Sequence, residues 1–68
     1  METKERLKEF VDLFDDNFGE LAKYLDLSYQ SLNKKLNNHV DFKRTEIKKI
    51  KDRYSLSPDQ VCYIFFDD

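Results

Sequence analysis

The sequence predicts an all-α domain of five helices, and three observations lead to this prediction. Apolar residues recur at i, i+3, i+4 and i+7 in successive segments, which is the spacing of one helix face. Residues whose side chains cap helix N-termini precede these segments. No stretch of any length alternates apolar and polar residues as a strand does. A chain of 68 residues forms one domain, 1–68, and needs an efficient core because such domains bury only about 60% of their unfolded surface.

The first helix is predicted to run from Thr3, as its N-cap, to about Phe14 or Asp15. Its apolar stripe is expected to lie in the core and consists of Leu7, Phe10, Val11 and Phe14.

The second helix is expected to start after Asn17, an N-cap residue followed by Glu20 at the third position, as in a variant of the capping box. Its apolar side consists of Phe18, Leu21, Ala22 and Leu25. Asp26 and Leu27 alone separate it from Ser28, the N-cap of a third helix with Leu32 and Leu36 on its apolar side. Two helices joined so closely predict a helix-turn-helix.

The third helix also carries a polar stripe, roughly opposite its leucines. Its members follow the spacing i, i+3, i+4, i+7 and are Gln30, Asn33, Lys34 and Asn37. Asn and Gln side chains can pair with an adenine edge, and Lys can donate to guanine or to phosphate. A solvated helix face is the alternative, but on a helix-turn-helix the stripe favours base reading.

A fourth helix is predicted from Lys43 or Arg44 to Tyr54, with Ile47, Ile50 and Tyr54 on its apolar side. Positive charge at a helix N-terminus opposes the helix dipole, which a DNA phosphate would offset. Screening by solvent is an equal alternative.

Ser57 and Pro58 mark the start of a fifth helix, as its N-cap and its first helical residue. Val61, Ile64 and Phe65 are expected to point inward. Phe42 is expected to turn inward from the preceding loop, and one of the adjacent Phe65 and Phe66 must stay near the surface. An exposed terminal Phe is a candidate dimer contact or a cover for the core edge.

The net charge of −2 is unevenly distributed. Residues 1–27 hold four bases and eight acids (−4), residues 28–53 hold eight bases and three acids (+5), and residues 54–68 hold three acids (−3). The positive block starts where the third helix starts. This pattern predicts one basic face on an acidic body, which suits attraction to phosphates. A solvated, lysine-rich surface is the alternative.

Other features exclude several classes of protein. No run approaches 18 apolar residues, so no membrane span is expected, and the first residues lack the apolar segment of a signal peptide. The single Cys62 is expected to be a buried free thiol. These features fit the cytoplasm. His39 is the one histidine, and no catalytic set, metal site or cofactor motif can be composed, so an enzyme is not expected.

The sequence resembles the helix-turn-helix of bacteriophage Cro and repressor proteins. The stretch that carries the resemblance is Leu21-Ala22-x-x-Leu25-x-Leu27-Ser28-x-x-x-Leu32-Asn33-Lys34-x-Leu36. Two further segments resemble small phage regulators of Gram-positive bacteria. They are Phe42-x-x-x-Glu46-Ile47-x-x-Ile50 and Leu56-Ser57-Pro58-x-x-Val61-x-x-Ile64-Phe65-Phe66. The resemblance covers about residues 7–66. It implies a compact five-helix, lambda-repressor-like or Cro-like domain with the helix-turn-helix at helices 2 and 3.

The resemblance also implies a sequence-specific transcriptional regulator of a phage or prophage, which acts in the bacterial cytoplasm by occupying an operator in double-stranded DNA. Carried over by position, the DNA-binding residues are Ser28, Tyr29, Gln30, Asn33, Lys34, Asn37, Lys43 and Arg44. A second copy of the chain and a partner repressor protein are candidate protein partners. A homodimer would place two recognition helices about 34 Å apart on a pseudo-palindromic site.

Two positions depart from the family pattern. Phe18 stands where the family usually has a glutamine that holds a phosphate, and Asp26 stands where the turn usually has glycine. Together with the eight acids of residues 1–27, these departures support an alternative function. In this alternative the protein is a modulator or antirepressor that binds a partner repressor through its helix-turn-helix surface.

Overall fold

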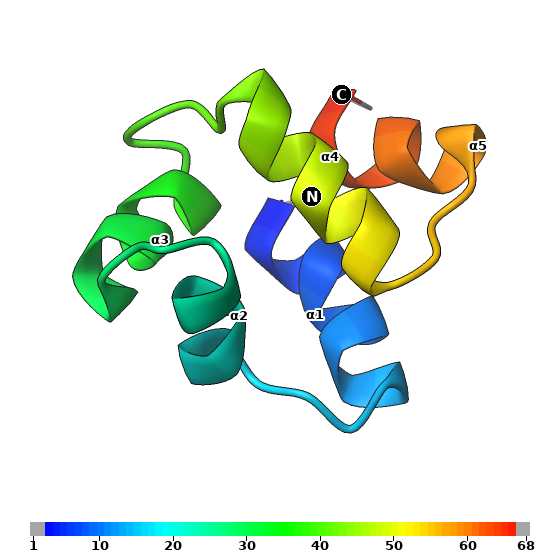
Figure 1. Ribbon diagram of the computed structural model, residues 1–68. Coiled ribbons are helices and arrows are strands. Elements are labelled where there is room, and N and C mark those ends of the chain that lie inside the picture. Colours follow the sequence, from blue (N-terminus) through cyan, green and yellow to red (C-terminus); the bar gives the residue numbers. More distant parts are fainter. Residues whose placement is uncertain (1–2, 67–68) are drawn as a thin grey trace.

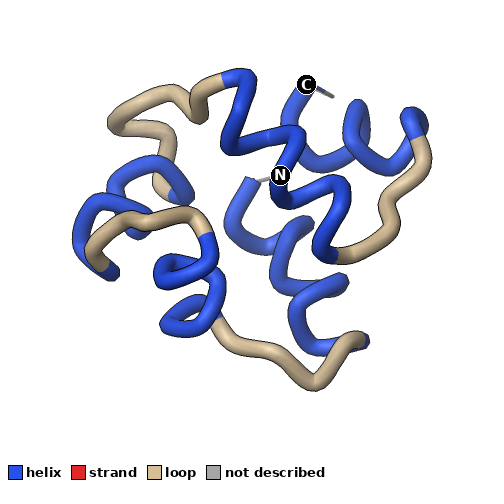
Figure 2. Tube along the Cα trace, viewed as in Figure 1, coloured by secondary structure: helices blue, strands red, loops and turns tan. Residues whose placement is uncertain are grey.

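The computed structural model describes residues 3–66, so Met1, Glu2 and the acidic pair Asp67 and Asp68 lie outside it. The predicted all-α class is confirmed, because residues 3–66 form helices and loops without a strand. The helices are α1 (Thr3–Leu13), α2 (Phe18–Tyr24), α3 (Tyr29–Leu36), α4 (Arg44–Arg53) and α5 (Pro58–Val61), and a π-helical segment (Cys62–Phe66) continues α5. Figure 1 shows α2 and α3 on one side of α1 and α4, with α5 on the other. Figure 2 shows the short loops that join them.

Side-chain caps begin three of the helices, as predicted. The Oδ1 atom of Asn17 accepts a hydrogen bond from the backbone N–H of Glu20 at 2.9 Å. Ser28 and Ser57 cap α3 and α5 in the same way, each at 3.1 Å from the N–H three residues later. Thr3 differs from the prediction, because it is the first residue of α1 and not its N-cap. These caps satisfy backbone donors that have no partner within the helix.

Four helices end with the same backbone device. The residue after each C-cap adopts a left-handed conformation, and these residues are Asp15 (φ 55°), Asp26 (φ 60°), Asn38 (φ 64°) and Ser55 (φ 51°). At every one of these ends the next N–H donates to the carbonyl five residues earlier, as in the Schellman motif. For example, Leu27 N–H donates to the oxygen of Ala22 at 2.9 Å. A non-glycine residue costs roughly 1–2 kcal/mol in this conformation, so packing must hold these sharp turns.

Leucines make up most of the core, and its members come from α1 to α4, the α4–α5 loop and the segment Cys62–Phe66. Its buried members are Leu7, Val11, Leu21, Ala22, Leu25, Leu32, Leu36, Ile50, Tyr54, Leu56 and Ile64. Half-buried aromatic side chains close its edges. Phe42 turns inward as predicted, and its ring meets that of Phe65 edge-on with centroids 5.2 Å apart. Phe66 is the member of the terminal Phe pair that stays exposed.

Two core predictions are wrong. Phe14 is 47% exposed because α1 ends at Leu13, and its ring lies edge-on to Tyr54 at 5.5 Å instead of entering the core. Cys62 is exposed. It lies two residues before the buried Ile64, and two residues correspond to nearly opposite sides of a helix.

Arg6 fastens α1 to the C-terminal segment. Its Nη1 donates to the backbone oxygen of Tyr63 at 2.6 Å, and its guanidinium carbon lies 4.8 Å from the centroid of the Tyr63 ring. The Tyr63 hydroxyl in turn donates to Glu9 Oε2 at 2.9 Å. The segment around Tyr63 is therefore held on α1 by both polar and aromatic contacts.

Asp16 connects the α1–α2 loop to the end of α4. Its two carboxylate oxygens accept from Arg53 Nε at 2.9 Å and Arg53 Nη2 at 3.1 Å, and Oδ2 also accepts from the Tyr54 hydroxyl at 2.6 Å. Arg53 stacks on Tyr24 of α2, with 4.8 Å from its guanidinium carbon to the ring centroid. The hydrogen bonds from Arg53, followed by those from Tyr54 and the Asn17 N–H, outweigh the effect of burial and lower the pKa of Asp16 from 3.8 to about 2.

We predict that Asp16→Asn destabilises the fold at neutral pH and flattens its acid unfolding. The folded-state pKa of Asp16 lies below its ordinary value, so the contribution is complete above pH 3.8 and is lost as the pH falls towards 2. The loss at pH 7 should be about 2 kcal/mol, measured by urea unfolding followed by circular dichroism.

Asp15→Asn is the matched control. Asp15 is the exposed neighbour of Asp16, and asparagine tolerates its left-handed backbone. Asp15→Asn should leave the free energy of unfolding within about 0.5 kcal/mol of the parent. Equal urea midpoints for Asp16→Asn and Asp15→Asn would contradict the assignment of Asp16 as the link between the α1–α2 loop and the end of α4.

Candidate nucleic-acid interface

The outward side of α3 presents most of the polar residues predicted to read bases. Gln30, Lys34 and Asn37 are exposed on it, and Asn33 is half-buried. Tyr29, at the first helical position, is 55% exposed. Exposed side chains with unsatisfied donors and acceptors are the kind that can enter a DNA groove.

The start of α3 is ordered by Ser28. Its Oγ accepts from the Ser31 N–H at 3.1 Å and donates to the Ser31 hydroxyl at 2.9 Å. The connection before it contains Asp26 in the left-handed conformation, and Leu27 N–H closes the end of α2. α2 and α3 pack directly on each other across this short connection. The first residues of α3 are thus fixed relative to α2.

Asn33 has a partner from outside α3. Lys4, in the first turn of α1, donates from Nζ to Asn33 Oδ1 at 3.2 Å. Thr3 Oγ1 lies 3.4 Å from Asn38 Oδ1, so the first turn of α1 also reaches the residue that follows the C-cap of α3. The start of α1 therefore borders the polar stripe.

Lys43 and Arg44, the other predicted contacts, are exposed at the start of α4. Lys43 occupies the N-cap position but has no side-chain acceptor for the free N–H groups of the first turn. Glu46 Oε1 accepts from the Lys43 backbone N–H at 2.8 Å and fixes the start of the helix from the other direction.

Lys35 and Glu46 form a buried ion pair between the last turn of α3 and the first turn of α4. Lys35 Nζ donates to the two Glu46 oxygens at 2.6 and 2.8 Å, and each side chain is 9% exposed. Burial disfavours ionisation of Glu46, but the hydrogen bonds from Lys35 and from the Lys43 N–H outweigh it and lower the pKa of Glu46. The pair holds the start of α4 beside the end of α3.

Two ion pairs remove bases from the predicted basic face. Lys35 and Arg53 were counted in the positive block, but each is engaged with a carboxylate inside the fold. The bases of residues 28–53 that remain exposed are Lys34, Lys43, Arg44, Lys48, Lys49 and Lys51. Lys34 is therefore the one exposed base of α3, and the other five lie at the start of α4 or along it.

The Lys35–Glu46 contact had a signal in the sequence. Lys35 lies three residues after Leu32, and Glu46 lies four residues before Ile50, so each charge falls on the apolar side of its helix. Opposite charges on the inward faces of consecutive helices indicate a buried pair. The contact between Lys4 and Asn33 has no comparable signal, because it depends on how α1 packs beside α3.

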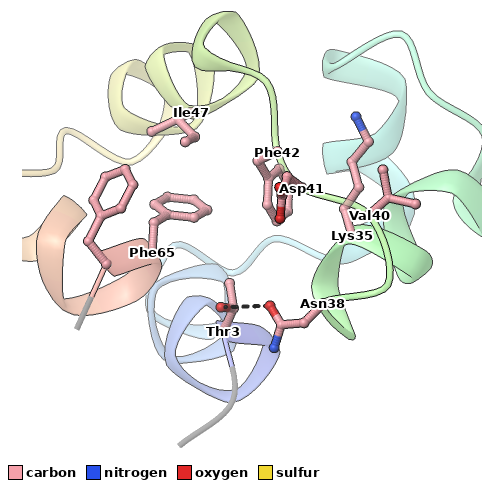
Figure 3. A pocket seen from close by; sticks show the side chains of 9 residues that line it. Thr3, Lys35, Asn38, Val40, Asp41, Phe42, Ile47 and Phe65 are labelled. Carbon is pink, nitrogen blue, oxygen red and sulfur yellow. Dashed lines mark hydrogen bonds between the residues drawn. The ribbon is translucent and has the colours of Figure 1, made fainter. Parts of the chain in front are cut away.

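A hollow of about 380 Å³ lies between the first turn of α1, the α3–α4 loop and the C-terminal segment. Figure 3 shows Phe42, Ile47 and Phe65 around it, with the Thr3–Asn38 hydrogen bond at one side. Phe66, which is 63% exposed, also lines it. The hollow is thus bordered by apolar side chains next to the loop that leads into α4.

Residues 13–68 match the family described as protein of unknown function (DUF739). The chain belongs to the DUF739 family. The match extends from the end of α1 through all later helices of the DUF739 chain. No curated protein and no solved structure matches this DUF739 chain.

Residues 3–66 of the DUF739 chain contain neither a helix that could cross a membrane nor a cluster that could hold a metal ion. None of the helices in this range has the length and apolar character needed to cross a bilayer. The same residues contain no cluster of three or more His, Cys, Asp or Glu side chains arranged to hold a metal ion.

We predict that Lys35→Met strongly destabilises this DUF739 domain. The substitution leaves the Glu46 carboxylate buried without its cation, which costs about 3–5 kcal/mol in comparable sites. The free energy of unfolding from urea titration at pH 7 measures the effect.

Lys34→Met provides the control, because it removes the same charge from the adjacent, exposed position of α3. It should change stability by no more than about 0.5 kcal/mol. A Lys35→Met protein as stable as Lys34→Met would mean that the ion pair does not hold α3 against α4.

Proposed function

We propose that this protein is a sequence-specific DNA-binding transcriptional regulator, in which α2 and α3 form a helix-turn-helix and α3 is the recognition helix. The observation that carries the proposal is the polar side of α3, where Gln30, Lys34 and Asn37 are exposed together. Arg or Lys contacts to guanine and Asn or Gln contacts to adenine are the commonest means of reading the major groove.

The surroundings of α3 support this function. The Lys35–Glu46 pair ties the start of α4 to the last turn of α3, so Lys43 and Arg44 follow the proposed recognition helix at a fixed position. Their position favours contacts with the phosphates that flank a groove occupied by α3. Ser28 and Tyr29 at the start of α3 complete the proposed set of DNA-binding residues.

The proposed mechanism involves no chemical step. Occupancy of an operator in a phage or prophage genome would block polymerase or bias its access to a promoter. Binding as a dimer would present two recognition helices about 34 Å apart. Affinity should fall steeply with salt because each phosphate contact releases counterions.

A partner repressor protein is the second candidate ligand of the same surface. Asp26 places an exposed carboxylate in the connection between α2 and α3, where it would repel DNA phosphates. Phe18, at the start of α2, has no group that could hold a phosphate. A modulator or antirepressor would use these residues against a protein.

A gel-shift experiment separates the two functions. The protein is titrated into labelled DNA from its own locus, with and without the repressor encoded beside it, at several salt concentrations. Direct operator binding predicts a shift with the protein alone that weakens steeply with salt. No shift alone, together with a change in the repressor–DNA band, would reject direct binding and support the modulator.

We predict that two substitutions in the proposed site have different effects. Asn33→Ala should weaken binding to the operator by about 1–3 kcal/mol and change binding to other DNA little. Lys43→Ser should weaken binding to all DNA sequences similarly. It should also reduce the slope of log affinity against log salt concentration by about one. Lys43→Ser should also stabilise the fold by about 1 kcal/mol, because serine supplies the missing acceptor at the N-cap of α4.

Lys49→Ala is the control for charge. Lys49 is exposed on α4, but it lies about 140° around the helix from Arg44. Affinity should change less than it does for Lys43→Ser, which removes the same charge. If Asn33→Ala and Lys43→Ser both bind the operator as tightly as the parent, the proposed site is wrong.

A further inference from the structure

We propose that Lys4 of α1 is a specificity-determining residue, and that Lys4 and Asn33 together select guanine at one base pair of the operator. This inference rests on the proposed function. It adds to the recognition helix a side chain that lies 29 positions earlier in the chain. It also changes the expected partner of Asn33 from adenine to guanine.

The geometry fixes the orientation of the Asn33 side chain. Lys4 Nζ lies 3.2 Å from Asn33 Oδ1. An ammonium group can only donate, so the amide oxygen must face Lys4 and the amide NH₂ must point away from it. The half-buried setting of both residues limits rotation that would exchange the two amide atoms.

The pair consequently has the chemistry of two adjacent donors. To recognise adenine, an asparagine must accept from N6 and donate to N7; Lys4 occupies one of the two lone pairs of the accepting oxygen and places positive charge beside the N6 hydrogens that would approach the other. Guanine presents two acceptors, O6 and N7, on the same edge. The NH₂ of Asn33 and the two remaining ammonium hydrogens of Lys4 are matched to those acceptors.

The first turn of α1 is held where this function requires it. Thr3 is hydrogen-bonded to Asn38 beyond the end of α3, and Arg6 is anchored to the C-terminal segment through the Tyr63 carbonyl. Lys4 lies between these two anchors. Its ammonium group is thus held beside the polar stripe and is not a freely moving surface charge.

The test is selection of duplex DNA from a random pool, followed by affinities for the selected site and its single-base variants. The parent should prefer guanine at the base pair that loses discrimination in Asn33→Ala. Lys4→Met frees the amide oxygen, so it should lose about tenfold in preference for guanine over adenine at that pair and keep its other preferences. Far-UV circular dichroism and thermal melting establish that the variant is folded.

Lys8→Met is the matched control. Lys8 is an exposed base of the same helix whose Nζ contacts Asp12 at 2.7 Å, so the substitution removes the same charge without touching α3. It should leave every base preference unchanged. If Lys4→Met weakened binding to all DNA sequences equally, Lys4 would be identified as a phosphate contact and the inference would be overturned.

Asn33→Asp is a second variant that keeps the contact with Lys4 and removes the outward donor. It should lose the preference for guanine, and a ratio of affinities for two DNA sequences cancels its general charge effect. Retention of that preference by Asn33→Asp, or by Lys4→Met, would reject the inference while the proposed function stands. Failure of the parent to enrich any sequence would reject the proposed function, and the inference with it.

Discussion

Glu46 is the group on which the arrangement of α3 and α4 depends. Its carboxylate is almost entirely removed from water, yet it stays ionised because Lys35 and the Lys43 N–H both donate to it. A charge in such a setting is tolerated only with complete compensation, so small displacements of either helix are costly. The Lys35–Glu46 pair therefore fixes both ends of the loop between α3 and α4. Apolar side chains in its place would hold the two helices together with a less specific geometry.

The helix ends impose a second constraint. Asp15, Asp26, Asn38 and Ser55 hold a left-handed backbone that glycine would adopt with less strain. The chain turns sharply after each helix, and the residue that follows, such as Leu56, can enter the core directly. Tight turns let a short chain bury its leucines without long loops. The backbone strain at these turns offsets part of the free energy gained by this packing.

Local patterns predicted most of the fold, and long-range contacts explain what they did not. The caps at Asn17, Ser28 and Ser57 and the inward leucines depend on residues a few positions apart, which a helical period captures. The exposed Cys62 was missed because the register of a short terminal segment is set by Ile64 packing on the core. In the candidate site the exposed stripe on α3 followed from spacing, whereas the link to Lys4 required two helices to be placed in space.

Charge placement reconciles an acidic chain with the proposed DNA-binding face. Lys35 and Arg53 are each paired with a carboxylate of the same chain. The bases of residues 28–53 that remain exposed are Lys34 on α3 and five residues at the start of α4 or along it. Lys43 is locally unfavourable there, because α2, α3 and α5 use Asn or Ser at the same position and α4 does not. A local conflict of this kind is expected where function, and not folding, selects the residue. At the start of α4 a cation gains little from the protein, since the helix dipole opposes it, but it would gain from a phosphate on DNA bound along α3.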